Sequence, residues 1–163
     1  MRKRSVIHGI KKTSAEYNPK NDFGLIVAVM ILFAFKLLFS SSEKGSKDLA
    51  EEFYSYEQKG EFSSSWELFH SNMKKKFSKG HYIQDRAYVF MNHFGVDTFT
   101  YTLGNPEKLK SWRMSKEDTA IKEVYKLTVI QTFKGKYGNF DIEQDIFVGK
   151  EKDEWAILWD YNK

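Results

Sequence analysis

Hydrophobic residues change their spacing twice along this chain. Residues 23–39 form an almost unbroken apolar run in which Lys36 is the single charge. Between residues 47 and 94 apolar residues recur every three or four positions, a spacing typical of amphipathic helices. From residue 97 onward they alternate with polar residues, which is typical of strands with one buried face. The pattern therefore predicts an apolar segment, then helices, then a sheet.

The apolar run is long enough to anchor the chain in a membrane. Its seventeen residues would span about 26 Å as a helix, close to the thickness of a hydrocarbon core. Six Lys and Arg residues precede it, and few follow it closely. The positive-inside rule then predicts a cytoplasmic leader at 1–22, a single transmembrane helix at 23–39, and an extracytoplasmic location from residue 40 onward.

Two other interpretations of this run stay open. Ser40, Ser41 and Ser42 are small residues at a position where a signal peptide could be cleaved. A leader of 22 residues is long for a signal peptide, however. The run could also be the buried helix of a soluble protein. Its length and its flanking charges favour the anchor.

A short polar linker is predicted at 40–46, followed by three amphipathic helices. Ser46 is placed to cap the first helix, Ser64–Glu67 reads as a capping box in the second, and the third ends at Gly95. Their apolar stripes should face one core. In order, the stripes are Leu49, Phe53 and Tyr56; Phe62, Trp66, Phe69 and Met73; and Ile83, Ala87, Phe90, Met91 and Phe94.

Hairpin-linked strands follow the helices. They are predicted at 97–103, 108–114 (weakly), 123–133, 139–148 and 154–160. Helices followed by a run of such strands give an α+β fold class, with three helices packed on a curved antiparallel sheet. Residues 47–163 should therefore form one domain.

Parts of this domain resemble a known family. The stretches HYIQDRAYVFMNHFGVDTFTYTLG and YKLTVIQTFKGKYGNFDIEQDIFVGKEKDEWAILWDYN are similar to nuclear transport factor-like (cystatin-like) cone domains. They are most similar to the N-terminal extension domain of methicillin-resistance-type penicillin-binding proteins. The ending W-x-hydrophobic-x-W-D is carried here by Trp155, Ile157, Trp159 and Asp160.

The resemblance implies a cone fold over residues 47–161. In those enzymes a transpeptidase chain follows the domain, whereas this chain stops three residues after Asp160, so no catalytic serine is carried over. Similar cones also occur on single-pass subunits of type IV secretion and conjugation machines. Both relatives imply a scaffold beside a machine of the cell envelope.

The charge distribution argues against a nucleic-acid partner. The net charge of +4 belongs to the leader, because residues 37–163 hold 19 basic and 20 acidic side chains. Nucleic-acid binding needs a concentrated basic face on the folded domain. The absence of cysteine excludes disulfides, thiolate metal sites and a lipid-modified cysteine.

No catalytic, cofactor or metal motif is present in the sequence. His70, His81 and His93 lack the i, i+4 spacing that places two metal ligands on one helix face. Asp97 and Asp160 are interpreted as capping or loop residues, because no second group for acid–base chemistry is evident. Some members of the wider fold are isomerases or dehydratases that use an Asp or His in the cone.

Two charged features lie on predicted surfaces. Lys74, Lys75, Lys76 and Lys79 form a basic patch that is either a solvated loop or a contact for anionic lipid or cell-wall polymer. Asp141, Glu143 and Asp145 form an acidic stripe on the wet face of a strand. Such a stripe would disfavour homodimers formed through that part of the sheet.

The alternation also predicts strand registers. Pairing Phe133 with Phe140 sets Val129 opposite Gln144 and Gln131 opposite Ile142. Pairing Val148 with Trp155 then sets Trp159 opposite Gln144.

Gln131, Gln144 and Trp159 should thus meet on an otherwise apolar face. Either these amides bond to each other, to the Trp159 indole or to a helix end, or they line a ligand or partner pocket at the opening of the cone.

The sequence thus predicts a non-catalytic interaction or scaffold domain, anchored in the membrane and displayed outside the cell. Its partners would be envelope proteins of peptidoglycan synthesis or conjugative secretion. The alternative is a small-molecule-binding or isomerase-like domain that uses the cavity of the cone.

Overall fold

The computed structural model describes residues 19–162, except for the side chains of residues 19–23, 25, 26 and 37–40. The chain divides into two compact units, Met1–Leu37 and Leu38–Lys163, and helix α1 (Pro19–Gln58) contributes residues to both.

The predicted leader lies almost wholly outside the described residues, and the predicted anchor lies partly outside them. Among the residues that are described, no helix is long and apolar enough to cross a membrane.

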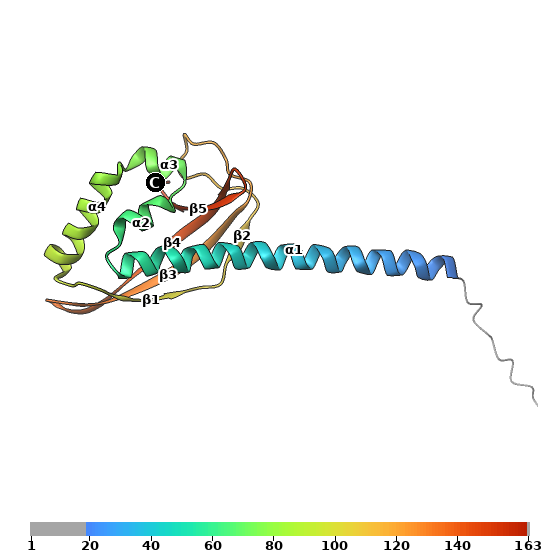
Figure 1. Cartoon of the computed structure of the whole chain (residues 1–163), viewed down its shortest axis with the longest axis horizontal. Helices are drawn as coiled ribbons and strands as arrows, with labels where there is room; N and C mark the ends of the chain where they lie inside the picture. The colour runs from blue at the N-terminus through green and yellow to red at the C-terminus, as the bar shows by residue number, and fades with distance from the viewer. Residues whose placement is uncertain (1–18, 163) are drawn as a thin grey trace, which may run out of the picture. The chain divides into compact units, whose positions relative to one another are not determined.

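The second unit is an α+β domain, as the hydrophobic pattern predicts (Figure 1). Its sheet is antiparallel, with the strand order β1-β3-β4-β5, and β2 pairs with β3 beyond the end of β1. Alternating polar and apolar residues build each long strand, because one face lies against the helices. The strands are β1 (Thr100–Leu103), β2 (Glu107–Leu109), β3 (Val124–Gly135), β4 (Gly138–Glu151) and β5 (Glu154–Trp159).

Residues 40–46, where a linker is predicted, are helical residues of α1. The role of Ser46 as a helix cap is therefore wrong, and its hydroxyl donates to the Glu43 carbonyl inside the helix. Packing explains the difference, because Ser46 is fully buried and a Cβ on Gly45 would lie 2.9 Å from Trp155 Nε1. Tertiary contact here overrides a locally polar, flexible composition.

The second predicted helix is two short ones, α2 (Phe62–Glu67) and α3 (Ser71–Lys76). The predicted capping box is wrong, because the helix begins one turn earlier and Ser64 lies inside it. Phe69 explains the break, since it forms a parallel bridge with Ile157 of β5. The apolar residues of the predicted stripe still reach the core.

The third predicted helix is α4 (Lys79–Ala87) continued by a π-helix, η1 (Tyr88–Phe94). It stops at Gly95 as predicted, with a left-handed φ of 64°. The wider π turn shifts the phase of the residues that follow it. Met91, predicted to face the core, is consequently 60% exposed.

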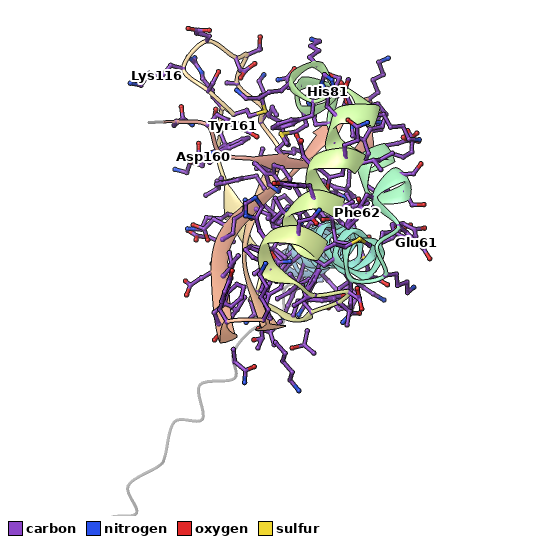
Figure 2. All side chains as sticks on the ribbon, turned by 90° about the vertical axis from the view of Figure 1, so that its left-hand side faces the viewer. Glu61, Phe62, His81, Lys116, Asp160 and Tyr161 are labelled. Carbon is purple, nitrogen blue, oxygen red and sulfur yellow. The ribbon has the colours of Figure 1, made fainter. Side chains whose placement is uncertain are left out.

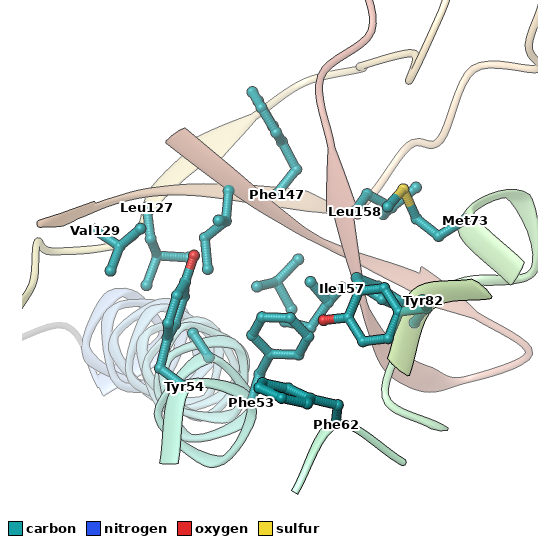
Figure 3. Packing of buried hydrophobic residues seen from close by; sticks show 14 of the residues in the cluster. Phe53, Tyr54, Phe62, Met73, Tyr82, Leu127, Val129, Phe147, Ile157 and Leu158 are labelled. Carbon is teal, nitrogen blue, oxygen red and sulfur yellow. The ribbon is translucent and has the colours of Figure 1, made fainter. Parts of the chain in front are cut away.

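The main core lies between the helices and one face of the sheet (Figure 3). Tyr54 of α1 lies beside Leu127 and Val129 of β3 in this view. Phe53 packs on Phe69 with ring centroids 5.2 Å apart. Apolar burial of this kind is the main source of stability for a domain of this size.

A second, smaller core lies on the other face of the sheet. Phe147 points to that face in Figure 3 and stacks on Trp112, with ring centroids 4.1 Å apart. The strand predicted at 108–114 ends at Leu109, as β2 of the sheet. Trp112, which follows it, pairs with Ile121 and covers Phe147 on this face.

The predicted register of β3 with β4 is confirmed, because Phe133 pairs with Phe140 and Gln131 with Ile142. The predicted register of β4 with β5 is wrong by two residues, since Val148 pairs with Ile157. The connecting turn lies at Lys152 and Asp153, which both adopt positive φ angles. A shift of two residues keeps every side chain on its predicted face.

Candidate functional site

The three residues predicted to form a pocket share the helix-covered face of the sheet, but only part of their arrangement is as predicted. Gln144 pairs with Val129 and lies diagonally from Gln131, as expected. Trp159, however, lies opposite Ile146, because of the shifted β4–β5 register.

Polar atoms of this group are buried without partners. Gln131 is 4% exposed. Neither Gln131 Nε2 nor Trp159 Nε1 has a hydrogen-bond partner among the described residues. The predicted bond between an amide and the Trp159 indole is therefore not formed.

Aromatic rings surround Trp159. Its ring lies 5.1 Å from that of Phe69 and 6.2 Å from that of Tyr82, measured between centroids. Phe53 and Phe77 also contact it. The chain's own side chains thus fill this part of the domain interior, and a ligand pocket at Gln131, Gln144 and Trp159 stays a prediction.

The most concentrated polar chemistry of the interior is a cluster that the sequence analysis missed. Glu57 of α1 is 1% exposed, and both of its carboxyl oxygens are hydrogen-bonded. Ser65 Oγ and Tyr82 Oη donate to Glu57 Oε1 at 2.5 and 2.7 Å. Arg86 Nε donates to Glu57 Oε2 at 2.6 Å, and Arg86 Nη2 lies 2.5 Å from the same oxygen.

The electrostatics of this cluster keep Arg86 charged and Tyr82 neutral. Burial works against the charge on Arg86, but the Glu57 carboxylate outweighs it and raises the pKa of Arg86. Burial and the same carboxylate raise the pKa of Tyr82 well above its usual range. Arg86 and Tyr82 thus hold fixed protonation states near neutral pH, whereas a general acid or base needs a pKa near the working pH. The cluster joins α1, α2 and α4 as a structural element.

One sequence signal could have revealed the cluster. Glu57 follows Ala50, Phe53 and Tyr54 at helical spacing, so it occupies a position of the buried stripe. A charged residue in such a position needs a partner of opposite charge in the fold.

The four lysines of the predicted basic patch make different contacts in the folded domain. Lys74 and Lys79 both approach Glu67, at 3.6 and 2.6 Å. Both also lie over the ring of Trp66. Lys76 lies 3.8 Å from the centroid of the Tyr161 ring.

Lys75 instead lines a hollow of about 450 Å³ beside the β2–β3 loop. Lys122 and Lys150 line the same hollow, together with the acidic residues Glu117 and Asp118. A neighbouring hollow is lined by Lys76, Lys116, Glu117 and Tyr161, among others. Lys116 and Tyr161 lie at one end of the domain in Figure 2. Both hollows are lined by residues of both charges. Their lining therefore does not favour a polyanion over another ligand.

The other residues considered in the sequence have structural roles where the structure gives them a role. Asp160 accepts hydrogen bonds from the backbone and side-chain amides of Asn162, as expected for a loop residue. His70 caps α3 by accepting from the Asn72 amide at Nδ1. The described residues contain no group of three metal-binding side chains.

An exposed apolar surface lies at the end of the domain where β3 turns into β4. We call Tyr88, Met91 and Tyr137 the tip surface, and their exposures are 55%, 60% and 88%. The backbone amide and the ammonium group of Lys136 donate to the carbonyls of Phe94 and Asn92. These bonds hold the β3–β4 turn, which carries Tyr137, against the end of η1, the helix that carries Tyr88 and Met91.

No protein-family model matches the chain, and no curated protein matches it either. The resemblance to cone domains of penicillin-binding proteins and secretion subunits therefore stays a prediction.

Proposed function

We propose that this protein is a membrane-anchored, extracytoplasmic interaction domain of a cell-envelope assembly. Residues 23–39 serve as the single transmembrane helix, with the N-terminus in the cytoplasm, and residues 47–163 adopt a cone fold outside. The length of the apolar run and the excess of Lys and Arg before it support this topology.

The tip surface is the observation that carries the proposal of an interaction domain. Scattered exposed apolar residues are ordinary, but neighbouring ones mark contact sites. Here a π-helix turns Met91 outward beside Tyr88, and π-helical segments are frequent at functional sites. Tyrosine and methionine are enriched in protein–protein interfaces.

The tip surface lies far from the point at which the chain enters the domain. Gln58 lies near the tip, because its side chain donates to the Phe99 carbonyl and it shares a hollow with Gly95 and Lys134. Residues 38–58 of α1 extend about 30 Å. The tip surface is therefore at the other end of the domain from the residue where the chain enters it.

A protease experiment tests the topology. Protease added to intact cells or protoplasts should remove residues beyond about 45, while membrane fractions of untreated cells retain the full chain. A protein found mainly in the medium and beginning near Glu43 would instead establish a cleaved signal peptide.

Photo-crosslinking tests the interaction. A photoreactive amino acid at Met91 or Tyr137 should give an adduct of defined mass with an envelope protein in living cells. Lys152, exposed in the β4–β5 turn, is the matched control position and should give none. Equal labelling from all three positions, or none from any, would contradict the tip surface as an interface.

A further inference from the structure

The two edges of the sheet are treated differently by the fold. At the β5 edge, the chain segment between α2 and α3 pairs with the strand. Ile157 donates its amide to the Leu68 carbonyl at 2.8 Å and accepts from the His70 amide at 3.0 Å. The outer side of β5 is therefore closed at its centre.

No backbone segment of the described residues pairs with the outer side of β1 in this way. Gly104 donates its amide to the Thr128 carbonyl, which fixes the phase of hydrogen bonding between β1 and β3. Paired residues in an antiparallel ladder alternate between bonded and non-bonded pairs. Thr102 and Thr100 therefore direct their backbone groups toward β3, whereas Tyr101 and Leu103 direct theirs away from the sheet.

A hydrogen bond just before β1 agrees with this alternation of inward and outward backbone groups. Phe99 has the same parity as Tyr101, and its outward carbonyl is taken by the Gln58 side chain at 2.7 Å. Beyond Phe99, no described residue is hydrogen-bonded to the backbone of Tyr101 or Leu103. β1 is the last strand of the sheet on this side, as Figure 1 shows.

The sequence of β1 guards the open edge only by its shortness. Natural edge strands are commonly protected by being very short, by a lysine or a proline, by a bulge or by a covering segment. β1 has four residues but neither lysine nor proline, since it reads Thr-Tyr-Thr-Leu, and Thr and Tyr have high strand propensity. Among the described residues, a backbone segment is bonded to the outer side of β5 and none to the outer side of β1.

Hollows lie at both ends of the open edge. One of about 440 Å³ is lined by Thr98, Thr100, Thr132 and Lys134 among others. The other, of about 280 Å³, is lined by Asn105 and Pro106 with residues of α1. Strand addition uses backbone hydrogen bonds for affinity and side-chain hollows for specificity, and the β1 edge offers both.

We propose that the β1 edge binds an extended segment of another protein, which adds to the sheet as a further strand beside Tyr101 and Leu103. An alternating row of amides and carbonyls is matched only by another extended backbone. The segment would carry hydroxyl or β-branched side chains beside the exposed Thr100 and Thr102. This site depends on neither the membrane anchor nor the tip surface.

Amide exchange of the full-length chain tests whether the edge is open. The amides of Tyr101 and Leu103 should exchange at least about tenfold faster than those of Thr100 and Thr102, which bond to β3. Equal protection of all four amides would overturn the proposal, because the edge would then be closed within the chain.

A peptide selection tests the binding. Random linear 12-residue peptides displayed on phage are selected on the full-length chain, and the most enriched sequence is synthesised. Its binding should protect Tyr101 and Leu103 from exchange. Leu103→Pro, which removes an outward amide, should weaken binding more than about tenfold. Leu103→Ala loses similar packing but keeps the amide, so it should retain most of the affinity.

Three results would overturn the proposal. They are the absence of any enriched peptide, an enriched peptide that leaves both amides unprotected, and equal binding by Leu103→Pro and Leu103→Ala. If the amides of Tyr101 and Leu103 become more protected as the concentration of the chain rises, without any peptide, the edge binds a second copy of the chain instead. Protection at Thr100 and Thr102 shows in each case that the variant sheet is folded. Loss of crosslinking at the tip surface would leave these results unchanged.

Discussion

Arg86 of α4 holds the carboxylate of Glu57, from α1, inside the layer of helices. The Glu57 side chain is wholly buried, while the Arg86 side chain is 22% exposed. Arg86 also covers the ring of Phe90, with its guanidinium carbon 4.5 Å from the ring centroid. Because Ser65 and Tyr82 bind the other carboxylate oxygen, the pair sets the mutual position of three helices.

Breaking this ion pair should destabilise the domain strongly. Arg86→Met leaves a buried carboxylate without its cation, and the free energy of unfolding should fall by about 3–5 kcal/mol. The double variant Glu57→Leu/Arg86→Met should recover most of this loss, because an apolar pair replaces two charges. Urea unfolding followed by tryptophan fluorescence measures both. A loss below about 1 kcal/mol in Arg86→Met would show that the pair is solvated.

Stability should decrease in mild acid through His70. Burial lowers the pKa of His70 below its ordinary value of 6.5, although Glu151 partly opposes the shift, and Lys75 and Asp118 act more weakly. The unfolded chain then binds the proton more tightly than the folded one. The free energy of unfolding should therefore fall as the pH drops below about 6.5 toward the lower folded-state pKa.

A matched pair of variants isolates this effect. His70→Asn keeps a side-chain acceptor for the Asn72 amide but does not titrate, so the slope of stability against pH should flatten. His81→Asn changes an exposed histidine of α4 and should leave the slope as it is. The same slope in both variants would assign the pH dependence to other groups.

Replacing Gln131 with leucine should stabilise the domain. Its amide nitrogen is buried without a partner among the described residues, and leucine removes that donor while filling similar space. We expect Gln131→Leu to raise the free energy of unfolding by about 1 kcal/mol. Gln144→Leu, at a half-buried position, should change it little.

Activity separates the two interpretations of these amides. A stable Gln131→Leu or Gln144→Leu protein that no longer complements a deletion strain would support the predicted pocket. A destabilised Gln131→Leu protein would mean that the amide is bonded in the folded state, and the structural interpretation would hold.

The smaller core on the other face of the sheet should contribute measurably to stability. Trp112→Ala removes a ring stacked on Phe147, and the free energy of unfolding should fall by about 2–4 kcal/mol. Tyr137→Ala, at an 88% exposed position, is the control and should change it by less than about 0.5 kcal/mol. Similar losses in the two variants would show that Trp112 is not packed in this way.

The sequence by itself determined the long strands and one hairpin register. In β3 and β4 apolar residues recur at alternate positions, and this alternation, together with the short turn between Phe133 and Phe140, predicts the pairing that is observed. The side-chain period of a strand is two, so the pattern carries this information locally. The end of the third helix at Gly95 was readable for a similar reason, since few residues adopt a left-handed φ easily.

Tertiary structure alone decided the break at Phe69, the ion pair of Glu57 with Arg86, and the open edge at Tyr101. Each depends on residues far apart in the chain: Phe69 meets Ile157, and Glu57 meets Arg86. Hydrophobic periodicity reports which face of one element is buried, but it does not report what that face meets. The partner of a backbone group or a buried charge is set by how the elements pack, because such contacts form only once the fold brings them within bonding distance.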